Sequence, residues 1–175
     1  TVNGENSIAV GSNNTINGEN SYALGNNIKS ESEESEGIAA IGSDILNTAG
    51  SSNILIGEEI TNTSGDENIL QGKEVENTGS SNILLGNSVT NVGSDNIVLG
   101  NSSKILGPSS KVTSSANIAI GNAAGVAGGV GNIAMGNVAI NAGGTGSIAI
   151  GNGAGSGAAA GIIAMGNGAA VGAAQ

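Results

Sequence analysis

The sequence contains no cysteine, histidine, phenylalanine or tryptophan, and these absences narrow both its chemistry and its fold. Without cysteine or histidine there is no disulfide framework, no usual zinc site and no catalytic arrangement built on a thiol or an imidazole. One tyrosine is the only aromatic residue, whereas glycine occurs 32 times. Large side chains that would fill a thick core are missing, so we expect a thin one.

Charge is absent from much of the chain. All fourteen acidic residues lie between Glu5 and Asp95, and no residue after Lys111 carries a side-chain charge. The net charge of −10 would repel phosphate backbones and anionic lipid. We therefore expect no nucleic-acid partner and no attraction to an anionic membrane surface.

Long apolar runs are also missing. No run approaches the length of a bilayer-spanning helix, and the chain starts at Thr1 without a basic and apolar leader. We interpret the chain as a segment excised or processed from a longer protein and expect no direct membrane insertion of this segment.

Motifs of catalysis and cofactor binding are missing as well. The sequence has no Ser-His-Asp set, no P-loop and no GxGxxG after a strand, so we expect no enzymatic activity and no cofactor. The pairs Glu58-Glu59 and Asp66-Glu67 raise the question of calcium, but neither the GGxGxD nonapeptide nor an EF-hand loop is present. Solvated acidic faces explain these residues better than a metal site.

What the sequence does contain is a short repeat. An apolar triplet followed by glycine recurs eleven times, at intervals of fourteen or fifteen residues in all but two cases. The triplets occupy residues 8–10, 22–24, 39–41, 54–56, 69–71, 83–85, 97–99, 118–120, 133–135, 148–150 and 163–165. Such a period predicts a solenoid, whose units bury apolar surface by stacking on their neighbours.

Each repeat has room for two short strands. The triplets read as buried strands flanked by turn residues, and a second apolar position follows three residues after the glycine at Ile28, Ile45, Ile60, Val75 and Val89. We therefore predict an all-β, parallel β-roll of 14–15-residue coils, forming one domain over residues 1–175. A low-complexity linker would not hold aliphatic residues at a fixed phase through eleven repeats.

Asparagine also recurs at a fixed place, five residues after the glycine. The residues are Asn47, Asn62, Asn77, Asn91 and Asn141. This position suits a bend with left-handed backbone conformation, and we expect asparagine ladders between coils as well.

The triplets also predict an oligomer. If the first and third residues fill the inside of the roll, the middle residue points outward and forms an apolar stripe that another chain must cover. The interface predicted in this way consists of Ala9, Ala23, Leu55, Leu70, Leu84, Val98, Ala119, Ala134 and Ala149. A cyclic homo-oligomer would cover the stripe without leaving an open face.

Gln71 is the exception among the third triplet residues, because the other ten are aliphatic. If it is buried, its amide needs partners, which copies of itself, an ion or a water in a symmetric oligomer could provide. A tolerated defect in one coil is the simpler interpretation.

Two insertions interrupt the repeat, near residues 29–37 and 102–115. Insertions in a solenoid form surface loops and often lie on the binding face. The alternative is that a charged, serine-rich loop is exposed to solvent and binds nothing. The candidate receptor-binding residues in these loops are Lys29, Glu31, Glu33, Glu34, Glu36, Pro108 and Lys111.

The repeats Asn6-Ser7-Ile8-Ala9-Val10-Gly11, Asn20-Ser21-Tyr22-Ala23-Leu24-Gly25 and Ser147-Ile148-Ala149-Ile150-Gly151 closely resemble the head repeat of YadA-like trimeric autotransporter adhesins. The resemblance covers nearly the whole chain. It implies a homotrimer of left-handed parallel β-rolls on the Gram-negative cell surface, above a coiled-coil stalk and a C-terminal outer-membrane anchor. The acidic insert, the leucine-rich middle coils and the lack of a recognisable neck, stalk or anchor depart from the family pattern.

The resemblance also implies the class of partner. Heads of this family bind collagen, fibronectin, laminin or receptors of the carcinoembryonic-antigen cell-adhesion type, and the fold does not choose among them. The alternative function is a structural spacer or fibre segment that binds nothing itself. An ice-binding solenoid is disfavoured because regular Thr-x-Thr rows are missing.

Overall fold

Every secondary-structure element of the described chain is a β-strand, as the repeat predicts. The computed structural model describes residues 1–105 and 114–172. Contacts between residues divide the chain into two compact units, Thr1–Asn87 and Ser88–Gln175. Within the described segments no helix has the length and apolar character needed to cross a bilayer.

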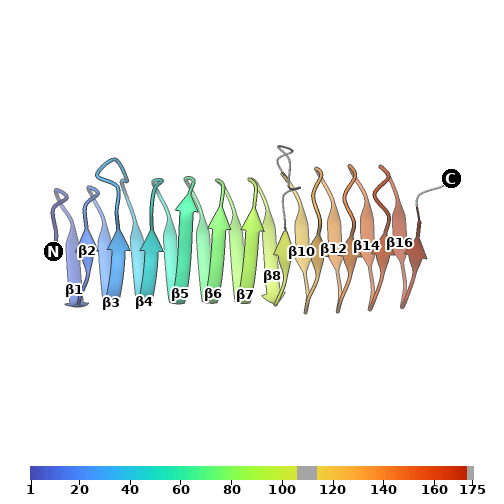
Figure 1. Cartoon of the computed structure of the whole chain (residues 1–175), viewed down its shortest axis with the longest axis horizontal. Coiled ribbons are helices and arrows are strands. Elements are labelled where there is room, and N and C mark those ends of the chain that lie inside the picture. Colours follow the sequence, from blue (N-terminus) through green and yellow to red (C-terminus); the bar gives the residue numbers. More distant parts are fainter. Residues whose placement is uncertain (106–113, 173–175) are drawn as a thin grey trace. The chain divides into compact units, whose positions relative to one another are not determined.

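The N-terminal unit is a parallel β-solenoid (Figure 1). Its strands are β1 (Ile8–Ser12), β2 (Thr15–Ile16), β3 (Tyr22–Ser30), β4 (Ala39–Asn47), β5 (Ile54–Ser64) and β6 (Ile69–Thr78). Equivalent triplet residues lie opposite one another, so that Ile8 pairs with Tyr22 and Ile54 with Ile69. The repeat read from the sequence is therefore the stacking register of this unit.

The C-terminal unit repeats this arrangement with shorter strands. They are β8 (Ile97–Asn101), β9 (Lys104–Ile105), β10 (Ile118–Ile120), β11 (Gly125–Val126), β12 (Ile133–Met135), β13 (Ile140–Asn141), β14 (Ile148–Ile150), β15 (Gly155–Ser156), β16 (Ile163–Met165) and β17 (Ala170–Val171). Strand β7 (Ile83–Val92) contains the boundary between the units. The triplet strands β8, β10, β12, β14 and β16 pair in parallel. The second strands β9, β11, β13, β15 and β17 form a parallel ladder of their own.

The predicted second strand of each coil is present, but its separation from the triplet strand differs between units. From β3 to β6 the backbone passes through the glycine as one continuous, bent strand. In the C-terminal unit the two parts are separate strands, for example β10 and β11. The five predicted second apolar positions, from Ile28 to Val89, are buried, which confirms their assignment to the core.

The predicted direction of the triplet side chains is wrong. The middle residue points into the coil: Leu55, Leu70, Leu84, Val98, Ala119, Ala134 and Ala149 are fully buried, Ala23 is 2% exposed and Ala9, in the first coil, is half-buried. The first and third residues face outward, with Ile8 55% and Val10 54% exposed. A coil of about fifteen residues encloses little space, so one side chain of each triplet lies inside and the other two lie outside.

Backbone bends at the glycine explain why the second strand keeps its expected apolar face. In β4, Gly42 has φ 140° and Asp44 has φ 53°, which places two left-handed conformations within three residues. The inward positions are therefore two residues before the glycine and three residues after it, as in Ala40 and Ile45. This spacing of five breaks the alternation of a straight strand.

Buried asparagines form ladders on the inside of the coils. Asn62 Nδ2 donates to Asn47 Oδ1 at 2.8 Å, and Asn77 Nδ2 donates to Asn62 Oδ1 at 2.8 Å. A second ladder runs beside it, in which Asn68 donates from Nδ2 to Asn53 Oδ1 at 3.0 Å. The ladder prediction is confirmed, whereas the left-handed backbone expected at the asparagines five residues after the glycine is not found.

Candidate binding surface

The outer face of the triplet strands is a largely apolar exposed surface of each unit. We call it the triplet face and define it by the first and third residue of every triplet. In the N-terminal unit its exposed members include Ile8, Val10, Tyr22, Leu24, Ile41, Ile54, Ile69 and Ile83, and in the C-terminal unit Met135, Ile163 and Met165. None of the 22 triplet-face positions carries a charge. Contiguous apolar surface of this kind marks an interaction site.

This surface replaces the interface predicted from the sequence. Eight of the nine predicted interface residues are at most 2% exposed within their own chain and have no surface left for another chain. An apolar stripe does run along the coils, but it is formed by the first and third triplet residues and not by the predicted middle ones. The size of the side chains gave no signal for this direction, because the middle residues include leucine and valine as well as alanine.

Gln71 lies on the triplet face and is exposed. It pairs in register with Ile56 of the preceding coil, and Ile69 lies two positions earlier on the same strand. Among the described residues no hydrogen bond reaches its side-chain amide. It is therefore a polar group surrounded by aliphatic side chains on the surface, and not a defect inside the coil.

The first predicted insertion is a projecting acidic loop (Figure 1). Lys29 and Ser30 still belong to β3, and the loop proper covers residues 31–37. Glu31, Glu33, Glu34 and Glu36 are all exposed, and Lys29 is exposed on the outer side of the strand. The loop makes its coil two residues longer than the next one, since Tyr22 pairs with Ala39 and Ala39 with Ile54.

Several hydrogen bonds hold this loop against its neighbours. Asn20 Nδ2 donates to Glu36 Oε1 at 2.8 Å, and the Glu36 backbone N–H donates to Ser51 Oγ at 3.1 Å. The Glu34 backbone N–H donates to Ser32 Oγ at 3.1 Å within the turn. The tip at Glu33 and Glu34 is thus presented on an anchored base.

Part of the second predicted loop, near residues 102–115, lies outside the described residues. Pro108 and Lys111 lie outside the described residues, so their prediction as binding residues stays a prediction. The described residues that flank this part, Lys104 to Ile105 and Ser115, pair with neighbouring coils of the C-terminal unit.

Two further places on the N-terminal unit contain acidic side chains near one another or near a lysine. Glu5, Glu19 and Glu33 line one hollow together with Asn3 and Asn17. At the bend after the glycine, Lys73 Nζ lies 3.5 Å from Glu58 Oε2, with about half of each side chain exposed. An ion pair this exposed contributes little stability. Within residues 1–105 and 114–172, no three acidic side chains converge in a way that could hold a metal ion.

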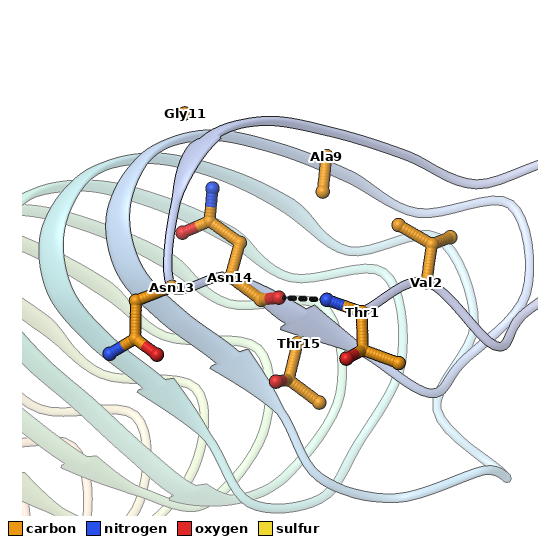
Figure 2. A pocket seen from close by; sticks show the side chains of 7 residues that line it. All are labelled: Thr1, Val2, Ala9, Gly11, Asn13, Asn14 and Thr15. Atoms are coloured by element: carbon orange, nitrogen blue, oxygen red, sulfur yellow. Dashed lines mark hydrogen bonds between the residues drawn. The ribbon is translucent and has the colours of Figure 1, made fainter.

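A hollow lies at the first coil of the N-terminal unit. Figure 2 shows it, lined by Thr1, Val2, Ala9, Gly11, Asn13, Asn14 and Thr15, and in it the Thr1 nitrogen donates to the Asn14 carbonyl at 2.6 Å. Ala9 is half-buried here, whereas its counterparts in later coils are buried.

No protein-family model matches the chain, and no curated protein matches its sequence.

Proposed function

We propose that the chain is the head of a bacterial cell-surface adhesin, a non-enzymatic homotrimer of left-handed β-rolls that binds a host protein. The proposed location is the outer surface of the outer membrane, with anchoring by a region beyond this segment. The observation that carries the proposal is the triplet face, which is apolar in 21 of 22 positions and uncharged throughout. Together with the family-like repeats, it favours a copy of the same chain as its partner.

Charge supports self-association through this face and not through another. A chain with a net charge of −10 repels its own copies wherever the acidic side chains meet. The triplet face is free of these charges, while the bends and the loop over residues 31–37 carry them. Copies joined at the triplet face bury aliphatic surface, at roughly 25 cal/mol per Å², and leave the acidic residues in water.

The proposed ligand is an extracellular-matrix protein or an epithelial receptor of the carcinoembryonic-antigen type. The acidic loop is the proposed contact, because it projects from a regular scaffold on an anchored base. Charged residues at the rim of an interface mainly accelerate encounter, and neighbouring coil surface would supply most of the affinity.

Oligomeric state is tested first. Light scattering of the purified chain should give three times its mass of 16.6 kDa. Ile69→Glu on the triplet face should dissociate the oligomer, because like charges would be buried together. Thr63→Glu, at an exposed position in the later part of β5 and away from the triplet, should leave it intact. A monomeric parent chain, or dissociation by both substitutions, contradicts this part of the proposal.

Binding is tested with immobilised collagen, fibronectin, laminin and a carcinoembryonic-antigen-type ectodomain. Deleting Glu33 and Glu34 gives the coil the fifteen-residue spacing of its neighbour and should weaken binding at least tenfold, or about 1.4 kcal/mol. The matched control, Glu33→Gln with Glu34→Gln, keeps the loop length and should mainly slow association. Unchanged affinity after the deletion would move the site to the coil faces.

The competing proposal is a structural spacer. Three of the five outward positions of the second strands in the C-terminal unit favour it, since Gly125, Gly155 and Ala170 offer few distinctive side chains, whereas Lys104 and Ile140 occupy the other two. Failure of the head to bind any member of the panel, with full adhesion by a parent protein lacking the head, would support the spacer.

A further inference from the structure

We infer that Gln71 fixes the axial register between copies of this chain when they associate through the triplet face. The inference rests on the self-association proposed above and adds to it a residue that selects one alignment. It begins from the uniformity of the triplet face. Neighbouring coils present nearly the same side chains at the same positions, as in Ile54 beside Ile69.

Such uniformity creates a problem of alignment. Parallel coils repeat about every 4.8 Å along the stack. Sliding one copy past another by one coil would again place aliphatic side chains against aliphatic side chains, with little loss of contact. The apolar columns therefore supply affinity but distinguish poorly between the aligned and the slipped arrangement. A regular solenoid needs some irregular residue to choose between them.

Gln71 has the chemistry for that choice. It is the one amide among the 22 positions of the triplet face, it is exposed, and its described surroundings leave its amide without a hydrogen bond. An amide is both a donor and an acceptor, so equivalent amides in a cyclic assembly can satisfy one another in a closed ring. Only the aligned register brings the copies of Gln71 to the same level.

Slipped registers would bury the amide against aliphatic neighbours. A slip by one coil places Gln71 at the level of Ile56 or of Leu85, the third residues of the preceding and following triplets. An unsatisfied buried amide disfavours such a state by about tenfold or more for each copy. Single polar residues in apolar seams select register in coiled coils by the same physics, and they reduce stability in doing so.

The test uses the natural absence of cysteine. Val10 and Leu24 occupy adjacent positions of one column and are 54% and 53% exposed. Two full-length chains of different mass, Val10→Cys and Leu24→Cys, are refolded together and oxidised, so that facing cysteines form disulfides, which require Cβ atoms about 3.8 Å apart. Aligned copies join Val10→Cys chains to each other, whereas copies slipped by one coil join Val10→Cys to Leu24→Cys chains.

With Gln71 present we expect mixed products to be a minor fraction. Gln71→Leu should raise the mixed fraction several-fold and lower the concentration at which the oligomer dissociates, because the amide no longer has to be desolvated. Moving the amide by one coil, as Ile56→Gln with Gln71→Ile, should return the mixed fraction to its low value. Gln71 is exposed and Ile56 is half-buried on the same outer face, so these changes leave the buried middle residues Leu55 and Leu70 in place.

Two failures are distinguishable. If Gln71→Leu oligomerises and still gives few mixed products, the register inference is overturned and self-association stands. If light scattering finds no oligomer of the parent chain, both the inference and the proposed self-association are overturned.

Discussion

At the scale of single residues, the buried asparagines give the coil interior a polar half beside its aliphatic half. Leu55 and Ile60 are fully buried near the glycine bend, and Asn53 and Asn62, each two positions further from that bend, are fully buried as well. Asn62 bonds to Asn47 of the coil before it and to Asn77 of the coil after it. The polar half therefore links coils in a fixed register, which the aliphatic half alone would not require.

We expect Asn62→Ala to destabilise the chain by about 2–3 kcal/mol. The substitution removes one acceptor of Asn77 Nδ2 and the shorter of two donors to Asn47 Oδ1, both at 2.8 Å, and leaves one buried N–H of Asn77 without that partner. Urea unfolding measures the change. Asn137→Ala is the matched control, because Asn137 belongs to an exposed ladder and bonds to Asn152 at 3.1 Å in contact with water. Equal effects would mean that burial does not set the cost.

Serine at ladder positions gives the converse prediction. Ser30 pairs in register with Asn47, and its hydroxyl is buried without a partner among the described residues. Ser30→Asn would extend the ladder by one amide and should stabilise the chain by about 0.5–1.5 kcal/mol, measured by thermal unfolding. A loss of stability would show that the space around residue 30 is too small for the amide.

At the scale of the element, the glycine that closes each triplet permits the coils to stack. At Gly72, φ is 144°, and a Cβ would overlap the carbonyl oxygen of Gly86 in the next coil. The backbone of one coil therefore approaches the next so closely that no side chain fits, and the conformation itself strains other residues.

Gly72→Ala should cost about 2–5 kcal/mol, combining backbone strain with displacement of the adjoining coil. Gly125→Ala should be nearly neutral, because Gly125 does not have positive φ and an added Cβ would meet the Lys104 carbonyl oxygen at an ordinary 3.6 Å. Denaturant midpoints of the two variants provide the comparison. Tolerance of alanine at residue 72 would contradict the close approach of the coils.

The same element shows how far sequence reasoning reaches. Strand positions, parallel stacking, the second apolar position and an asparagine ladder follow from a period of about fifteen residues, because each depends on spacing alone. The direction of the triplet does not follow from spacing. It depends on the conformations at Gly42 and Asp44 and on the narrow space inside the coil, and neither is visible in the alternation of Ala39, Ala40 and Ile41.

At the scale of the whole molecule, the two units differ sharply in charge. The N-terminal unit contains thirteen of the fourteen acidic residues and two lysines, whereas the C-terminal unit contains one acidic residue and two lysines. Stacking places many of these carboxylates on neighbouring coils, as in the parallel bridge between Glu19 and Glu36. Repulsion among them opposes folding of the first unit and is absent from the second.

Salt should therefore stabilise the units unequally. Raising sodium chloride from about 20 to 500 mM shortens the Debye length from roughly 20 Å to below 5 Å and screens the repulsion. Hydrogen exchange should slow in peptides from residues 1–87 and change little in peptides from 88–172. Equal slowing in both units would point to a general salt effect and not to the acidic residues.

The candidate surface was predictable only in outline at this scale. Exposure of the glutamates over residues 31–36 follows from an insertion in a regular solenoid, since extra residues have no place in the stack. The position of the apolar face could not be derived, because it depends on which triplet residues point outward, and that direction was predicted wrongly. Gln71 was singled out by its sequence, but its place outside the coil required the structure.

Parallel stacking also gives each unit a characteristic mechanical behaviour. The hydrogen bonds between coils, such as those between β4 and β5, run along the direction of stacking. A pull along that direction puts the full force on every layer of bonds in series, so the weakest layer breaks first. A pull along the strands would instead spread the force over many bonds in shear. Each unit should consequently yield at its weakest layer and extend coil by coil, dissipating work at low force.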